Sequence, residues 1–213
     1  MPPKFKSEAQ KQAVQAQILD AARELFVAKG VEAVTMREIA KKIGYSATTI
    51  YLHFKDKEAL IHALCLTDFK TLGVELAVIL QNPEPVNRLV DLGLAYARFA
   101  LAYPNHYRMM FMTEKPPHAL QEDEIDPSWD AYKLLNDVVN DVYQAGYFLP
   151  EYDNPELIAQ TVWAAIHGVC SLEITMKNDC HIVWCDIAER VRFMQKVVLR
   201  GLLNPVAAHK LGE

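Results

Sequence analysis

The sequence predicts an all-α fold of about nine helices, arranged as a three-helix head at the N-terminus and a larger helical body behind it. Apolar residues recur at three- and four-residue spacing along most of the 213 residues, which is the period of an amphipathic helix. Alternating segments bounded by hairpin turns, which are the signature of strands, do not stand out. The eleven prolines and eight glycines cluster between the helical segments, where they end helices.

The first helix of the head is expected from about Ser7 to Lys29. Its apolar residues lie on one face, which the rest of the head can bury. Gly30 follows directly, at the position where a glycine commonly ends a helix. The apolar face consists of Val14, Ile18, Ala21, Ala22, Leu25 and Phe26.

Two short helices complete the head. The second begins at Thr35, where the sequence TMRE forms a capping box for the first amides, and it ends at the next glycine. The third begins at Ser46, which is a good N-cap. At about 100° per residue, Ile50 faces the core, whereas Thr48 and Thr49 face outward. Because β-branched residues are poor choices for a short helix, these outward threonines indicate a role at the surface.

The body begins with a fourth helix from about Asp56 to Leu80, and the chain divides into a head of residues 1–57 and a body of residues 58–213. Prolines and polar runs separate the later segments. Residues 113–127 are acidic and contain prolines, so a loop is expected there. Further helices are expected at about 86–102, 104–112, 128–145, 155–177 and 181–203.

The net charge of −5 conceals a difference between the two parts. The head holds ten Lys/Arg and six Asp/Glu, for a net charge of +4. The body holds twelve Lys/Arg and twenty-one Asp/Glu, for a net charge of −9. A small basic head on an acidic body indicates that the head alone meets an anionic partner.

Two short helices that are joined by a tight glycine turn and packed on a longer helix form a helix-turn-helix head, whose second short helix enters the DNA major groove. Outward threonines suit this position, because a threonine offers a hydroxyl to a base edge and a methyl to thymine. Side chains around this helix, and the helix N-termini, offer donors to phosphates. The predicted DNA contacts are Thr35, Arg37, Tyr45, Ser46, Ala47, Thr48, Thr49, Tyr51, His53, Lys55 and Lys57.

The segment AARELFVAKGVEAVTMREIAKKIGYSATTIYLHFKDKEAL resembles the DNA-binding head of the TetR family of bacterial transcriptional regulators. The resemblance covers about residues 14–60, and Leu52 departs from the aromatic residue that is frequent there. Downstream, WAAIHG at residues 163–168 resembles the Trp-His-Gly signature of one class of C-terminal domain in that family. The matching residues of the head are Ala22, Leu25, Phe26, Gly30, Thr35, Ile39, Ala40, Gly44, Tyr51, His53, Phe54, Lys57, Glu58 and Leu60.

The resemblance implies an all-helical homodimer that binds a palindromic double-stranded DNA operator and usually represses a nearby gene. By position, Ser46, Tyr51, His53 and Lys57 match residues that touch phosphates in the family, and residues 47–49 match the base-facing segment. The body would bind a small effector, and its last two long helices would pair across a two-fold axis. The basic N-terminal tail is placed to reach the minor groove, as such arms do elsewhere.

An aromatic and methionine band in the body has two interpretations. It either lines a pocket for an apolar or aromatic effector, with a few polar anchors, or fills an ordinary helical core. A third interpretation makes the body an adaptor that binds another protein through the acidic loop at 113–127. The candidate effector residues are Tyr96, Phe99, Tyr103, Tyr107, Met110, Phe111, Tyr132, Trp163, His167 and Met176.

The last long helix carries an apolar stripe at three- to four-residue spacing. The stripe is either intramolecular core or the seam of a dimer, and we expect the seam. Isologous packing would then place two heads on successive turns of DNA. The stripe consists of Trp184, Ile187, Val191, Met194, Val198 and Leu202.

Several other classes of protein are not expected. No nucleophile elbow, His-Glu metal motif or glycine-rich phosphate loop indicates an enzyme, and no cofactor is expected. Neither a signal peptide nor a membrane span is expected, so the four sparse cysteines are interpreted as reduced thiols in a cytoplasmic protein. No metal ligands are assigned, because the spacing of Cys170, Cys180, His181 and Cys185 matches no zinc pattern.

Overall fold

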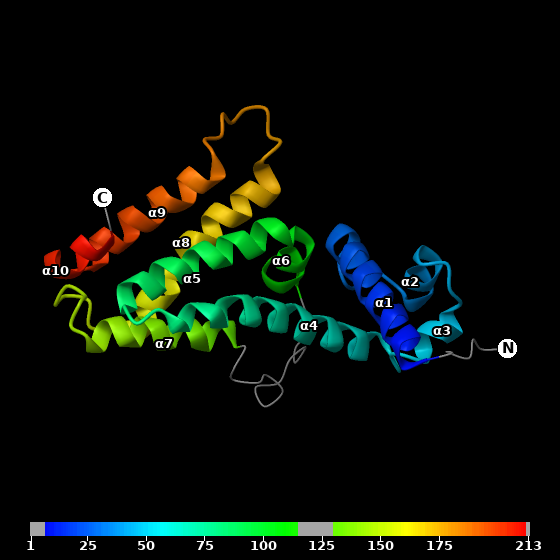
Figure 1. The fold of residues 1–213 in the computed structure, drawn as a ribbon. Helices are drawn as coiled ribbons and strands as arrows, with labels where there is room; N and C mark the ends of the chain where they lie inside the picture. The colour runs from blue at the N-terminus through cyan, green and yellow to red at the C-terminus, as the bar shows by residue number, and fades with distance from the viewer. Residues whose placement is uncertain (1–6, 115–129, 212–213) are drawn as a thin grey trace. The chain divides into compact units, whose positions relative to one another are not determined.

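The computed structural model describes residues 7–114 and 130–211, and in these ranges the chain is helical apart from turns and one isolated bridge between Phe148 and Leu203 (Figure 1). The all-α prediction is confirmed. Two predictions fall largely on other residues: the N-terminal tail before residue 7 and most of the loop at 113–127 lie outside the described ranges. The helices are α1 (Glu8–Lys29), α2 (Met36–Lys42), α3 (Ala47–Tyr51), α4 (Lys57–Ala77), η1 (Val78–Gln81), α5 (Pro85–Ala102), α6 (Pro104–Phe111), α7 (Ala131–Gln144), α8 (Pro155–Met176), α9 (Ile187–Leu202), α10 (Pro205–Ala208) and η3 (His209–Leu211).

Side-chain caps and glycines set the helix boundaries of the head, and the caps at Thr35 and Ser46 were expected. The hydroxyl oxygens of Ser7, Thr35 and Ser46 each accept the amide three residues ahead, at 3.2 Å. Such bonds satisfy donors that the first turn of a helix leaves without an intrahelical partner. Gly30 and Gly44 adopt φ angles of 82° and 73°, so each ends its segment in a conformation that L side chains rarely adopt.

The core of the head includes residues from outside α1, α2 and α3. Phe26, Ile39 and Ile50 bring α1, α2 and α3 together, and each of these side chains is fully buried. Leu64 of α4 and Met109 of α6 belong to the same apolar cluster. Full burial of side chains of this size contributes about 1.5–3 kcal/mol each, so the two additional helices stabilise the head substantially.

By its internal contacts the described chain forms two compact units. One unit comprises residues 7–70 and 105–114, and the other comprises residues 71–104 and 130–211. The boundary therefore lies inside α4, whereas the sequence suggested a division after residue 57. We call the first unit the head and the second the body, and we describe each by itself.

Four long helices make up most of the body. α8 packs against α5, α7 and α9, and α5 also packs against α7 and α9 (Figure 1). Asp130, Asn154 and Asp186 cap the N-termini of α7, α8 and α9 with their side-chain oxygens. The cap at Asp186 shows that α9 begins several residues later than the expected start at 181. Residues 177–186 instead form a connection with its own turn structure.

One helix of the described residues, α8, is long and apolar enough to cross a membrane by length and composition. Only 28% of its most apolar window is buried within the chain. A single such helix is weak evidence for a membrane span, because helices that pack inside soluble proteins have the same composition. Leu157 and Leu172 illustrate the exposed part, with 60% and 47% of their surface accessible. These residues lie on a face that another protein surface can cover.

Candidate DNA interface and effector site

The α3 helix presents an exposed surface beside a buried anchor. Ile50 is fully buried, whereas Thr48, Tyr51 and Leu52 are exposed. The prediction that Thr49 faces outward is wrong, because its side chain is buried and its Oγ1 lies 3.0 Å from Ser46 Oγ. The N-cap hydroxyl of Ser46 thus holds Thr49 against the head. Thr48 remains the exposed threonine of α3.

Basic side chains lie in the segment that follows α3. Lys55 is exposed, and Lys57 is half-buried at the first turn of α4, where its Nζ donates to the Glu32 carbonyl at 3.3 Å. Arg37 is exposed on α2. The Asp56 carboxylate caps the N-terminus of α4, where its Oδ1 accepts the Ala59 amide at 2.7 Å, and its negative charge partly offsets the positive charge of Lys57.

His53, a predicted DNA contact, is half-buried. Burial lowers the pKa of this imidazole, and repulsion from Lys11 lowers it further. The ring is therefore neutral at pH 7. Both ring nitrogens of His53 are buried in this conformation, so the side chain must turn outward before it can reach a phosphate.

A buried ion pair in the head was not predicted. Arg23 of α1 donates from Nη2 and Nε to the two carboxylate oxygens of Asp68 in α4, at 2.6 and 3.0 Å. His106 of α6 places Nδ1 3.0 Å from Asp68 Oδ1. Asp68 is completely buried, and Arg23 also donates to the exposed Asp20 at 2.7 Å. Burial alone would lower the pKa of Arg23, but the two carboxylates outweigh it and raise that pKa.

Three predicted effector residues form a hydrogen-bonded cluster in the body. Trp163 Nε1 donates to Tyr96 Oη at 3.1 Å, and Tyr96 Oη lies 3.4 Å from His167 Nδ1. An indole N–H can only donate, so Tyr96 Oη accepts it, and the tautomer of His167 decides which atom donates in the second contact. Burial lowers the pKa of His167, which favours the neutral form of the ring.

The other predicted effector residues lie either beside this cluster or away from it. The Tyr132 ring lies 5.8 Å from that of Trp163, and its hydroxyl donates to Glu156. The Phe99 ring lies 5.4 Å from that of Tyr103 in the same unit. Met176 is exposed at the end of α8. The remaining three, Tyr107, Met110 and Phe111, belong to the head unit, where Tyr107 and Met110 are buried.

An open hollow of about 400 Å³ lies elsewhere in the body, between the start of α8 and the end of α9. Leu157 and Thr161 line one side, and Val197 and Gly201 line the other. Its walls include none of the predicted effector residues. The hollow is part of the exposed outer surface of α8 and α9.

Of the predicted stripe, Trp184 lies before α9 rather than on it, and the other five residues lie on α9. Val191 is buried inside the chain, and the other five stripe residues are partly exposed. The most exposed apolar residues of α9 are instead Phe193 and Val197, with 71% and 55% of their surface accessible. Val191 therefore belongs to the interior of the body, and Met194 and Val198 border the exposed face that carries Phe193 and Val197.

Two family models match the chain. Residues 18–64 match the model described as bacterial regulatory proteins, tetR family. Residues 89–179 match the model described as tetracyclin repressor-like, C-terminal domain. The chain belongs to the TetR family. It carries the helix-turn-helix of DNA-binding transcriptional regulators, and its relatives in the family are regulators rather than enzymes.

Individual TetR-family relatives match over most of the chain. The transcriptional repressor KstR2 of Mycobacterium tuberculosis is 25% identical over 158 residues, which is 70% of this chain and 78% of KstR2. The solved structure of KstR2, a ketosteroid transcriptional regulator, covers 95% of this chain and 98% of its own, with a TM-score of 0.69 and 19% identity. A TetR family regulator from Marinobacter aquaeolei VT8 covers 93% and 100%, with a TM-score of 0.73 and 17% identity. At these identities the solved structures show a shared fold.

The cysteines of this TetR-family chain are expected to react in two classes. Cys65 and Cys170 are buried, whereas Cys180 and Cys185 are exposed. Burial raises the pKa of the Cys170 thiol to about 12, against a smaller opposing effect of Arg190. Because the thiolate is the reactive form, a thiol reagent at neutral pH should label two cysteines rapidly and the other two only after unfolding. Mass spectrometry of the labelled peptides checks this; rapid labelling of Cys170 would contradict its placement.

Proposed function

We propose that the protein is a ligand-responsive repressor that binds a palindromic operator as a homodimer in the cytoplasm. The observation that carries the proposal is the exposed α3 surface, which lies in the segment whose family match spans the helix-turn-helix. Thr48, Tyr51 and Leu52 are the exposed side chains that the proposal places nearest the bases or the adjoining backbone. Lys55, Lys57 and Arg37 would contact phosphates, which position the head without reading sequence.

The outer face of α8 and α9 is the proposed dimer surface. Leu157, Leu172, Phe193 and Val197 expose apolar area there, and an exposed apolar face of this extent is typical of a protein interface. Isologous pairing of this face would make one surface self-complementary across a two-fold axis. Two heads would then meet two half-sites about one helical turn apart.

The Tyr96–Trp163–His167 cluster is the proposed polar anchor of the effector site. It combines aromatic surface with hydrogen-bonding groups, as small-molecule sites do. An apolar or aromatic effector would release the operator only if it bound one conformation of the protein more tightly than the other. If no small molecule released the operator but a bound protein did, the adaptor interpretation of the body would replace this one.

Two substitutions in the head distinguish a residue that contacts phosphates from a residue that reads bases. Lys57→Ala should weaken binding to every duplex and reduce the dependence of binding on salt by about one counterion. Thr48→Ala should retain the salt dependence and change the preference among operator sequences, because a hydroxyl and a methyl at a base edge are lost. Fluorescence anisotropy on an operator and a scrambled duplex at several salt concentrations measures both effects.

The matched control for these substitutions is Gln17→Ala, on the exposed surface of α1. It should leave sequence preference unchanged. Equal effects of Lys57→Ala and Thr48→Ala on affinity, salt dependence and preference would show that α3 does not read bases in the proposed orientation.

A further inference from the structure

We propose that the turn after α8 binds one divalent transition-metal ion, with Asp179, Cys180 and His181 as its protein ligands. A carboxylate oxygen, a sulfur and an imidazole nitrogen from these successive residues lie within 4.8 Å of one another. This mixture of donors suits zinc, whose tetrahedral sites place neighbouring ligand atoms about 3.6 Å apart. Cys180 and His181 are exposed, so small side-chain rotations can bring the three atoms to that separation.

Backbone hydrogen bonds fold these three residues into a tight turn. The Asp179 amide donates to the Met176 carbonyl at 2.9 Å, and the Ile182 amide donates to the Asp179 carbonyl at 3.4 Å. The Asp179 Oδ1 accepts the His181 amide at 2.8 Å. A carboxylate can keep such a bond while it ligates a metal through its other oxygen. The turn therefore holds the ligand residues together before an ion binds.

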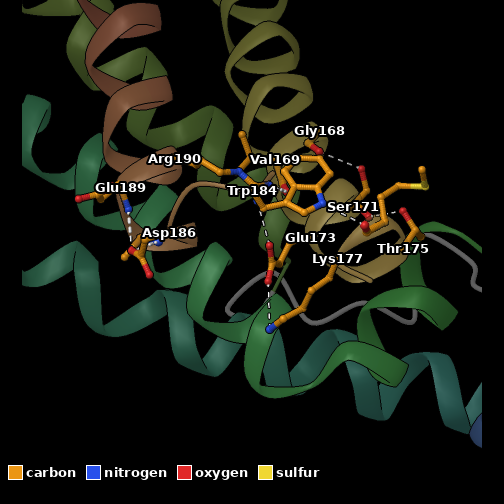
Figure 2. A network of polar contacts seen from close by, with 12 residues as sticks. Gly168, Val169, Ser171, Glu173, Thr175, Lys177, Trp184, Asp186, Glu189 and Arg190 are labelled. Atoms are coloured by element: carbon orange, nitrogen blue, oxygen red, sulfur yellow. Dashed lines mark hydrogen bonds and ion pairs between the residues drawn. The ribbon is translucent and has the colours of Figure 1, made fainter. Parts of the chain in front are cut away.

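A polar network anchors the connection that bears this turn (Figure 2). Trp184 Nε1 donates to the Met176 carbonyl at 3.0 Å, which ties the far end of the connection back to α8. The Arg190 guanidinium lies 4.4 Å from the centroid of the Trp184 ring and donates to Glu173 at 2.9 Å. Glu173 also pairs with Lys177 at 3.2 Å. Because both ends are fixed, ordering the ligands costs less conformational entropy than in an open loop.

The sequence did not indicate this site. Known zinc motifs space their cysteine and histidine ligands apart along the chain, whereas these three ligand residues are adjacent. Three protein ligands also leave one tetrahedral position for water or an outside ligand, as in open zinc sites. Cys185 lies in the same connection and is exposed, but it is not one of the clustered ligand residues. A bound ion would brace the link between α8 and α9, the two helices whose outer faces form the proposed dimer surface.

Cobalt(II) titration of the reduced, full-length protein tests the proposal, because a thiolate bound to Co²⁺ gives a charge-transfer absorption band. We expect one Co²⁺ per chain with this band, and its displacement by Zn²⁺. Cys180→Ser should abolish the band. His181→Ala and Asp179→Asn should each weaken binding by more than about ten-fold, since even changes outside the ligand set cost 10–100-fold. Asparagine at 179 retains an acceptor for the turn.

The matched control is Cys185→Ser, which removes an exposed thiol of the same connection and should leave the band and the affinity unchanged. Absence of a stoichiometric thiolate band in the wild-type protein would overturn the proposal. So would persistence of the band in Cys180→Ser, or its loss in Cys185→Ser. Circular dichroism of each variant confirms that the helices are intact, so a lost band reports the ligand rather than the fold.

Discussion

Phe193→Asp is expected to convert the protein into a monomer and to abolish operator binding. Phe193 is the aromatic side chain of α9, with 71% of its surface accessible, so its replacement should leave the monomer folded. Each protomer contributes one Phe193 to the proposed two-fold interface, so the substitution alters the interface at two positions. Loss of an aromatic anchor costs about 2 kcal/mol or more at a hot spot, so two copies should weaken dimerisation about 1,000-fold or more.

Analytical ultracentrifugation and operator titration measure these two consequences together. Val78→Asp is the matched control, because Val78 is 66% exposed but lies in η1, outside α8 and α9. The control should remain dimeric and bind the operator as the wild type does. A Phe193→Asp protein that dimerises with unchanged affinity would place the dimer surface elsewhere.

Asp68→Ala is expected to lower the free energy of unfolding of the head by about 3–5 kcal/mol. The substitution leaves the Arg23 guanidinium buried without the carboxylate that accepts two of its hydrogen bonds. Breaking one partner of a buried ion pair has this cost because the remaining charge is poorly solvated. Denaturant unfolding, followed by hydrogen exchange in α1 and α4, measures the loss in the head itself.

Asp20→Ala provides the control for the same arginine. The Asp20 side chain is 69% exposed, and its removal leaves Arg23 bonded to both oxygens of Asp68. Pairs that are open to solvent contribute about 0–1 kcal/mol, so this variant should unfold nearly as the wild type does. If Asp20→Ala and Asp68→Ala lowered the free energy of unfolding equally, burial would not be the reason that the Asp68 pair stabilises the head.

Local signals were the most predictable part of the fold. Thr35 and Ser46 are N-caps, and Gly30 and Gly44 end their segments, as expected from the sequence. These features depend on residues within one helical turn, which a sequence pattern contains. The family resemblance of the head rests on the same local residues, and the match over residues 18–64 confirms it.

Contacts between distant residues were not predictable in the same way. Arg23 and Asp68 are 45 positions apart, and their pairing arises only when α1 packs on α4. The predicted orientation of Thr49 was wrong for a different reason. A helical wheel gives the direction of the side chain, but it does not include the contact with the N-cap hydroxyl of Ser46. The cluster around Trp163 and His167 was easier to predict from the sequence, because their spacing of four residues places both on one face of α8.

The most direct test of the account is selection of duplexes from a random pool with the purified protein, followed by measurement of the stoichiometry on the selected site. The account predicts a palindromic sequence with two half-sites about one helical turn apart, occupied by two chains. It also predicts that Thr48→Ala selects a different sequence. Binding without sequence preference, or one chain on a single asymmetric site, would contradict the proposed operator-binding dimer.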